Sequence, residues 1–251
     1  MKPSTFFWYE LVTSDPTGAA DFYTQVVGWK PVPYRPDYTL LQVGGDRGVA
    51  GIMKTPAEVT VMPALWMGYL YADDVDAKAR EIVAAGGTVK KGPQDIPEIG
   101  RFAVATDLHG VPFMIMKPQG EDQPPLPMGT PGAIGWNDLS ADDGEEAFAF
   151  YSGLFGWTKG EAIPMGEMGA YQLYHAGSDE PAGGVMTKTP GRDAPFWLFY
   201  FVVPAIDAAR QRVIDAGGTV TMEPMEVPGG AWAMEAVDPQ GAKFGLTAAT
   251  R

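Results

Sequence analysis

An internal duplication constrains this chain more than any other feature. The segment DFYTQVVGW, which begins at Asp21, recurs as AFYSGLFGW, which begins at Ala149. Three further blocks match in the same order: VAGIMKTP with AGGVMTKTP, the apolar run around Trp66 with that around Trp197, and ATDLHGVPFMI with AVDPQGAKFGL. Chance does not produce four matched blocks in one order, so we infer that one structural unit is present twice.

Each copy predicts the element order β-α-β-β-β twice. The alternating strand FFWYELV precedes a segment with apolar residues at helical spacing, which Asp15 and Thr17 can cap. Between the copies, residues 119–132 are rich in Pro and Gly and have no apolar period, as is typical of a linker. We therefore predict an α+β chain with two domains, 1–118 and 133–251.

The composition excludes several classes of function. A formal charge of −13 disfavours nucleic acid and anionic membranes, because both are bound through Lys and Arg. The absence of cysteine excludes disulfides and thiolate catalysis. No apolar run is long enough to span a bilayer, and the N-terminus lacks the apolar core of a signal peptide. We therefore expect a cytoplasmic protein.

The doubled set of motifs resembles the vicinal oxygen chelate superfamily, which includes glyoxalases, bleomycin resistance proteins and extradiol dioxygenases. The matching features are the strand followed by D-x-x-x-x-x-x-FY-x-x-x-x-GW, the turns DLHG and DPQG before the last strand of each copy, and helices that end in AGG. The resemblance covers nearly the whole chain. It implies two tandem glyoxalase-like domains, each built of two βαβββ modules that form a cupped mixed sheet with a pocket on the concave face.

The resemblance also implies a divalent metal held by His, Gln or Glu side chains from four strands of each sheet. The corresponding positions of this chain hold other residue types: Trp8, Gly51, Met67, Met114, Trp136, Gly184, Leu198 and Gly245. Imidazole and carboxylate ligands are therefore missing where such a site needs them. We predict no metal and no other cofactor, which puts the metal-dependent activities of the family in doubt.

Two acids are candidates for chemistry. Glu10 and Asp138 share a strand face with Trp8 and Trp136, because side chains two residues apart on a strand point the same way. An acid beside an indole in a cavity has its pKa raised by desolvation and is able to act as a general base or to hold a cationic ligand. The alternative is that each acid only accepts hydrogen bonds from nearby donors.

His175 lies on a predicted strand and is the third catalytic candidate, against a purely structural role. His109, in the DLHG turn, is expected to face solvent. Aromatic and Met side chains suit a pocket for a flat or apolar molecule, although packing in the core is the simpler interpretation for any one of them. The predicted ligand-binding residues are Trp8, Tyr38, Met67, Tyr69, Met114, Trp136, Tyr171, Trp197 and Trp232.

Three functions stay open at this point. The first is a metal-free protein that binds a small apolar or aromatic, possibly cationic, molecule in a concave pocket. The second is a glyoxalase-like lyase or a dioxygenase-like enzyme, so that whether the chain is an enzyme at all stays undecided. The third is a structural or interaction protein whose cups are filled by its own side chains. Because two domains are already present, we expect a monomer.

Overall fold

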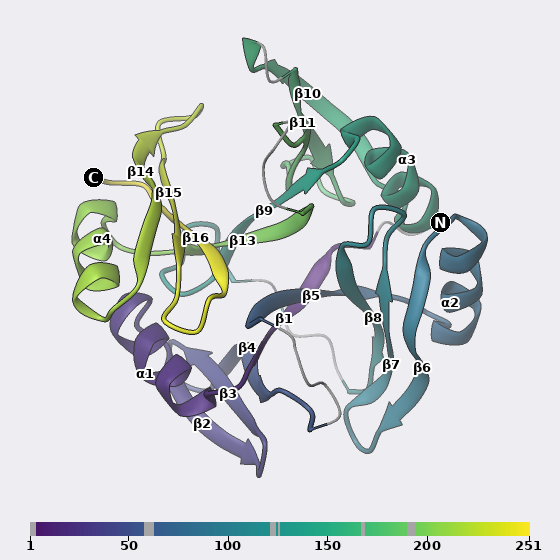
Figure 1. Cartoon of the computed structure of the whole chain (residues 1–251), viewed down its shortest axis with the longest axis horizontal. Coiled ribbons are helices and arrows are strands. Elements are labelled where there is room, and N and C mark those ends of the chain that lie inside the picture. Colours follow the sequence, from purple (N-terminus) through teal and green to yellow (C-terminus); the bar gives the residue numbers. More distant parts are fainter. Residues whose placement is uncertain (1–3, 58–62, 121–123, 125, 167–168, 190–193) are drawn as a thin grey trace. The chain divides into compact units, whose positions relative to one another are not determined.

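The computed structural model describes residues 4–57, 63–120, 124, 126–166, 169–189 and 194–251 (Figure 1). Its α+β architecture confirms the predicted fold class, and each repeat contains the βαβββ module twice. Part of the predicted linker, at 121–123 and 125, lies outside the described residues.

The first repeat contains two modules. The elements of the first are β1 (Phe6–Thr13), α1 (Pro16–Val26), β2 (Lys30–Arg35), β3 (Tyr38–Val43) and β4 (Arg47–Lys54). The elements of the second are β5 (Leu65–Tyr71), α2 (Val75–Ala84), β6 (Thr88–Ile96), β7 (Gly100–Thr106) and β8 (Pro112–Pro118). Every strand and helix that the sequence predicts in this repeat is present.

The second repeat has the same order. The elements of its first module are β9 (Ile134–Ala141), α3 (Gly144–Phe155), β10 (Thr158–Pro164), β11 (Ala170–His175) and β12 (Gly183–Thr187). The elements of its second module are β13 (Phe196–Val202), α4 (Ile206–Asp215), β14 (Thr219–Glu226), β15 (Trp232–Val237) and β16 (Lys243–Ala248).

Each repeat forms one mixed sheet of eight strands. The strand orders are β2-β3-β4-β1-β5-β8-β7-β6 and β10-β11-β12-β9-β13-β16-β15-β14. Within every module the first strand pairs in parallel with the last, and the other pairs are antiparallel. The parallel pairs place the first and last strands of a module next to each other. Their register determines which side chains lie close together on one face of the sheet.

Three of the helices begin at an aspartate cap, Asp15 for α1, Asp74 for α2 and Asp143 for α3, whereas α4 begins at Ala205 without a side-chain cap. The Asp15 carboxylate accepts a hydrogen bond from the Gly18 amide at 3.0 Å, and Pro16 opens α1 with a φ angle that suits a first helical residue. The Asp143 carboxylate accepts hydrogen bonds from the amides of Glu145 and Glu146 at the start of α3. The capping role predicted for Asp15 is confirmed.

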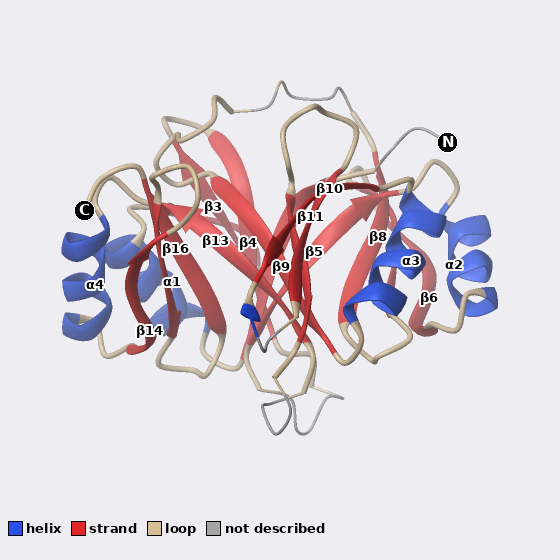
Figure 2. Ribbon diagram, turned by 90° about the horizontal axis from the view of Figure 1, so that it is seen from above, coloured by secondary structure: helices blue, strands red, loops and turns tan. Residues whose placement is uncertain are grey.

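The chain divides into two compact units that do not follow the repeats. The first unit comprises Met1–Trp8, Met67–Gln123 and Asn137–Trp197, and the second comprises Tyr9–Trp66, Pro124–Trp136 and Leu198–Arg251. Accordingly α2 lies beside α3 in the first unit and α1 beside α4 in the second, in both views (Figures 1 and 2). Each unit therefore combines a module from one repeat with a module from the other.

In the second unit, a buried tyrosine joins the two repeats. The hydroxyl of Tyr23, on α1, accepts a hydrogen bond from the indole of Trp66 at 2.8 Å and donates one to the carboxylate of Asp238 at 3.0 Å. That carboxylate also accepts from the backbone amides of Gln240 and Ala242. Trp66 and Phe244 pack edge-on against the Tyr23 ring, so the polar chain is enclosed by aromatic groups.

The first unit repeats this arrangement. The Tyr151 hydroxyl, on α3, accepts from the indole of Trp197 at 3.0 Å and donates to the carboxylate of Asp107 at 3.2 Å. Trp157, the last residue of the second GW pair, stacks on Tyr151 with ring centroids 5.0 Å apart and donates its N–H to the carbonyl of Ser4. The tyrosine and tryptophan of the FY-x-x-x-x-GW motif are thus core residues in both units.

Cations close the C-terminal ends of two helices inside these units. The Lys78 ammonium, on α2, donates to the Leu154 carbonyl at 2.7 Å near the end of α3. The Arg212 guanidinium, on α4, donates to the Val26 carbonyl at the end of α1. Because the last carbonyls of a helix have no partner within the helix and carry a partial negative charge, each cation both satisfies a carbonyl and ties one repeat to the other.

Removal of one buried hydroxyl tests this core. In Tyr23→Phe the Trp66 indole loses its acceptor and the Asp238 carboxylate loses a donor, while the ring stays in place. We expect the free energy of unfolding to fall by about 1–3 kcal/mol, the cost of burying polar groups without partners. Urea denaturation measures it. Tyr34→Phe is the control, since that side chain is 47% exposed, and it should change stability by less than about 0.5 kcal/mol. Equal effects of the two variants would contradict the role of the Tyr23 hydroxyl.

The same carboxylate predicts a pH dependence. Burial raises the pKa of Asp238 above its ordinary value of 3.8, although the bonds from Ala242 and Tyr23 act in the opposite direction. A native pKa above the unfolded pKa means that the native state binds more protons between the two values, so the stability contributed by this group falls as pH rises through that window. We expect the stability advantage of wild type over Asp238→Asn to shrink between acid and neutral pH in urea titrations. An advantage that grows with pH would contradict this sign.

Candidate functional site: tyrosine–acid pairs on the sheets

The two predicted acids occupy equivalent positions beside a glycine. Glu10, on β1, is the register partner of Gly51 on β4, and its residue is only 4% exposed. Asp138, on β9, is the register partner of Gly184 on β12 and is half-buried. In both modules the acid and the glycine are brought together by the parallel pairing of the first and last strands.

A tyrosine ring covers each of these glycines. A Cβ atom added to Gly184 would lie 2.0 Å from Cζ of Tyr171, and one added to Gly51 would lie 2.0 Å from the hydroxyl of Tyr38. The Tyr171 hydroxyl also donates a short hydrogen bond to the Asp138 carboxylate. The structure thus brings two of the predicted residues, Asp138 and Tyr171, into direct contact.

A third instance lies in the second unit and was missed by the sequence analysis. The ring of Tyr200, on β13, covers Gly245 on β16, where an added Cβ would lie 2.2 Å from the ring. The Tyr200 hydroxyl donates to Glu235, on β15, at 3.4 Å, and Glu235 is the register partner of Gly245. The comparison of the two repeats did not indicate this acid. In the first repeat Met114 matches Gly245, and the register partner of Met114 is Val104, which is not acidic. Its position opposite a glycine on the next strand was the available signal.

His175 shares a strand face with Tyr171 but is distant from Asp138. The pairing of Asp138 with Gly184, and of Gly184 with Leu173, places it two strands and two residues away, or about 12 Å between Cα atoms. Its ring lies next to Gly160, where an added Cβ would come within 2.8 Å of Nε2. This separation argues against a direct proton transfer between Asp138 and His175.

The other predicted ligand-binding residues differ in their burial. Tyr69 and Met114 are register partners on β5 and β8, and both are almost fully buried, as is Met67. The half-buried residues of the set are Trp8, Tyr38, Trp136, Tyr171 and Trp232. The indole N–H of Trp197 is donated to Tyr151 in the core, so the structure gives this residue a packing role. The ligand-binding roles stay predictions.

The residues present do not fit the metal that the family resemblance implies. Among the described residues, no group of three or more His, Asp or Glu side chains is placed to hold an ion. At Gly51, Gly184 and Gly245, a ligating side chain would also collide with the tyrosine that covers the glycine. The ligand types and the available space therefore both disagree with a metal site.

His109 does not face solvent, which corrects the sequence-based expectation. Its side chain is 9% exposed, and Nε2 lies 3.4 Å from the Glu146 carboxylate at the start of α3. The turn itself is held by Asp107, whose carboxylate accepts the amides of His109 and Val111. The histidine is buried because this turn packs against the helix of the other repeat.

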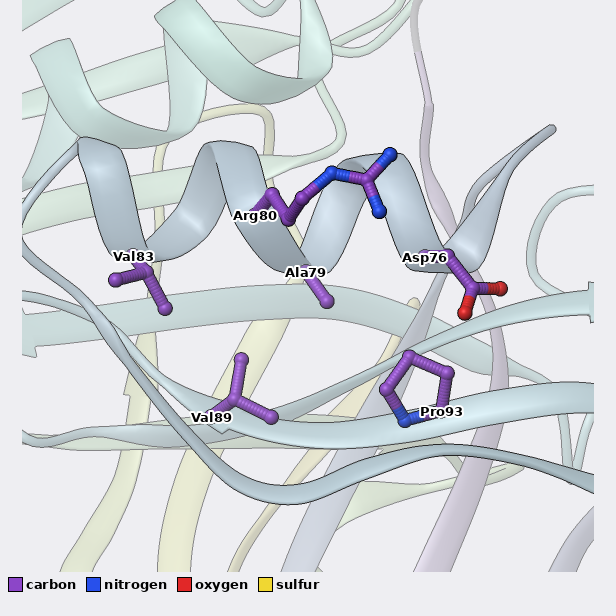
Figure 3. A pocket seen from close by; sticks show the side chains of 6 residues that line it. All are labelled: Asp76, Ala79, Arg80, Val83, Val89 and Pro93. Atoms are coloured by element: carbon purple, nitrogen blue, oxygen red, sulfur yellow. The ribbon is translucent and has the colours of Figure 1, made fainter.

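A groove lies away from these pairs, between α2 and β6 (Figure 3). It has a volume of about 380 Å³ and is lined by Asp76, Ala79, Arg80, Val83, Val89 and Pro93. None of these residues was predicted to bind a ligand. At one end, Asp76 is fixed by two hydrogen bonds from the Arg101 guanidinium, which lower the pKa of that carboxyl.

Within the described part of the chain, no helix is long and apolar enough to cross a membrane.

A glycine substitution tests the covered position. In Gly184→Ala the new methyl group meets the Tyr171 ring, so the ring must leave Asp138 or the strands must shift. We expect a loss of about 1–3 kcal/mol of stability in urea denaturation, as for other overpacked sites. The control is Gly153→Ala on α3, where a Cβ meets no neighbour and the better helix propensity of Ala should stabilise by about 0.5–1 kcal/mol. A neutral Gly184→Ala would show that the tyrosine does not occupy this space.

Comparisons with known proteins agree with this architecture. The family model described as Glyoxalase/Bleomycin resistance protein/Dioxygenase superfamily matches residues 5–115 and 133–246. The chain is 30% identical over 260 residues to the anthracycline biosynthesis protein DauV of Streptomyces sp. strain C5, covering 97% of this chain and 93% of that protein. It is 32% identical over 245 residues to the protein named "Putative glyoxylase CFP32" of Mycobacterium bovis, covering 95% and 92%.

Solved structures show the same fold at low sequence identity. The Mn(II)-bound glyoxalase from Novosphingobium aromaticivorans superposes with a TM-score of 0.70 at 15% identity, covering 100% of this chain and 83% of that one. The 2,2',3-trihydroxybiphenyl 1,2-dioxygenase from Sphingomonas wittichii superposes with a TM-score of 0.71 at 11% identity, covering 98% and 90%. With the family match over both repeats, the chain belongs to the glyoxalase/bleomycin resistance protein/dioxygenase superfamily.

Proposed function

We propose that this chain binds a small apolar or aromatic molecule on its sheets without a resident metal ion. The observation that carries the proposal is the tyrosine ring over Gly51, Gly184 and Gly245, where the resemblance places metal-ligating side chains. A tyrosine offers a flat apolar surface and a hydroxyl, which are the groups that recognise an aromatic ligand. The fold supports a binding site, and the side chains on it support a ligand other than an ion.

The relatives support an aromatic ligand. DauV, which aligns over nearly the whole chain, is named as an anthracycline biosynthesis protein. As a class of compound, anthracyclines are flat and polycyclic and carry hydroxyl groups. The half-buried Trp8, Tyr38, Trp136, Tyr171 and Trp232 provide stacking surfaces of the required kind. The charge of −13 favours a neutral or cationic compound over an anionic one. Since each compact unit already joins both repeats, we further propose that the chain acts as a monomer.

An enzymatic function is the second candidate, and the name of CFP32 as a glyoxylase favours it. With the present residues it would depend on acid–base chemistry, with Glu10 or Asp138 as the proton acceptor. Asp138 is half-buried and hydrogen-bonded to Tyr171, which would orient the carboxylate for such a role. His175 is too far from Asp138 to form a pair with it.

A thermal-shift titration with an anthracycline, compared with methylglyoxal and glutathione, tests the proposal. A ligand at 100 times its Kd stabilises the native state by about 2.7 kcal/mol, which raises Tm by about 5–11 °C for a chain of this size. We expect this shift for the anthracycline and none for the glyoxalase substrates. Metal analysis of protein purified without chelator accompanies the titration. Stoichiometric metal, or turnover of methylglyoxal with glutathione, would favour the enzymatic function instead.

A further inference from the structure

Two tyrosine hydroxyls each donate a hydrogen bond to a carboxylate. Tyr171 donates to Asp138 in the first unit, and Tyr200 donates to Glu235 in the second. A phenol has one O–H donor and two acceptor lone pairs, and an ionised carboxylate has acceptors only. Once the phenolic proton points at the acid, each pair presents hydrogen-bond acceptors and a negative charge to whatever approaches it.

The glycine beneath each ring shows that the pair is sterically built into the sheet. Gly184 and Gly245 have no room for a Cβ because Tyr171 and Tyr200 lie against them. Each acid is the register partner of that glycine, on the adjacent strand, so the side chain of the acid stands beside the ring. Both modules thus place a tyrosine and an acid beside a glycine of the last strand, although the two side chains come from exchanged strands: the tyrosine from the third and the acid from the first in one module, and the reverse in the other.

This arrangement reverses the polarity of the position. A metal ion attracts lone pairs, and therefore oxyanions, enolates and carbonyl oxygens. A phenol–carboxylate pair attracts N–H and O–H donors and repels anions, because every atom that it presents is an acceptor. Asp138, Tyr171 and Glu235 are half-buried, which leaves part of each residue accessible while reducing the competition from water. Tyr200 is only 6% exposed, so Glu235 is the accessible member of its pair.

We propose that Tyr171–Asp138 and Tyr200–Glu235 select ligands that carry hydrogen-bond donors, namely phenolic hydroxyl or protonated amino groups on an aromatic ring. This selectivity rests on the proposed binding function and adds to it the chemical class of the ligand. It gives Tyr200 and Glu235 a role in ligand binding. It also predicts that aromatic compounds of the same size differ in affinity according to whether one substituent donates a hydrogen bond or carries a negative charge. Aromatic carboxylates are the class that both pairs reject.

Three naphthalene compounds that share one ring system test the selectivity: 2-naphthol, 2-methoxynaphthalene and 2-naphthoate. Calorimetric titration of the full chain at neutral pH gives each Kd. We expect 2-naphthol to bind about tenfold more tightly than 2-methoxynaphthalene, as one hydrogen bond to a charged acceptor provides. We expect 2-naphthoate to bind most weakly of the three.

The acids are tested separately, because they lie in different units and a folding defect in one variant leaves the other informative. In Asp138→Asn and Glu235→Gln the negative charge is lost and an N–H donor is added. We expect at least one variant to lower the preference for 2-naphthol several-fold and to bind 2-naphthoate more tightly than wild type. Asp21→Asn, at an exposed position on α1, is the matched control and should leave all three values unchanged.

The outcomes separate this inference from the function on which it rests. Equal binding of the three compounds, or tighter binding of 2-naphthoate by wild type, would overturn the selectivity and leave aromatic binding intact. A preference that both variants keep would also overturn it, because the acids would then not be its source. If no compound binds up to its solubility, the binding function and the selectivity fail together.

Discussion

The structure depends on a hydroxyl group that is buried between an indole N–H and a carboxylate, once in each compact unit. Tyr23 holds this position with Trp66 and Asp238, and Tyr151 holds it in the other unit. Burial raises the pKa of both tyrosines well above 10, so each phenol keeps its proton and stays a donor over the whole physiological range. The acid that receives this proton always belongs to the other sequence repeat. The duplication is therefore interlocked, and neither repeat alone contains a complete chain of hydrogen bonds.

This interlocking gives the motif residues a structural role. The FY-x-x-x-x-GW segment and the turns DLHG and DPQG mark the family in the sequence, and in the structure they form the core of the two units. Trp29 and Trp157 are buried and donate their indole N–H to backbone carbonyls. These motif residues are therefore committed to packing and hydrogen bonding in the core, and the binding that we propose falls to side chains on the strands between them.

The fold was predictable from the sequence because it is expressed in local and repeated signals. Alternation in FFWYELV, the cap at Asp15 and the glycine after α2 each describe one element, and the second copy repeats the whole order. The tyrosine–acid pairs depend instead on register between strands. Asp138 and Tyr171 are far apart in sequence, and only the pairing of β9, β12 and β11 brings them into contact. His109 was misplaced for a similar reason, since the helix that covers it comes from the other repeat.

The metal-free function that we propose requires the space and the charge of a metal site to be accommodated in another way, and the three covered glycines meet this requirement. Glycine at 51, 184 and 245 provides no ligating side chain, and a tyrosine occupies the space where a Cβ atom would lie. Glu10, Asp138 and Glu235 are the register partners of these glycines, and Asp138 and Glu235 each accept a hydrogen bond from a tyrosine hydroxyl. A carboxylate that is half-buried on a sheet costs free energy unless a donor satisfies it, and the tyrosine supplies that donor. Packing and electrostatics thus require the same residue, so restoring a metal would take a ligand in place of the glycine and, in addition, removal of the tyrosine above it.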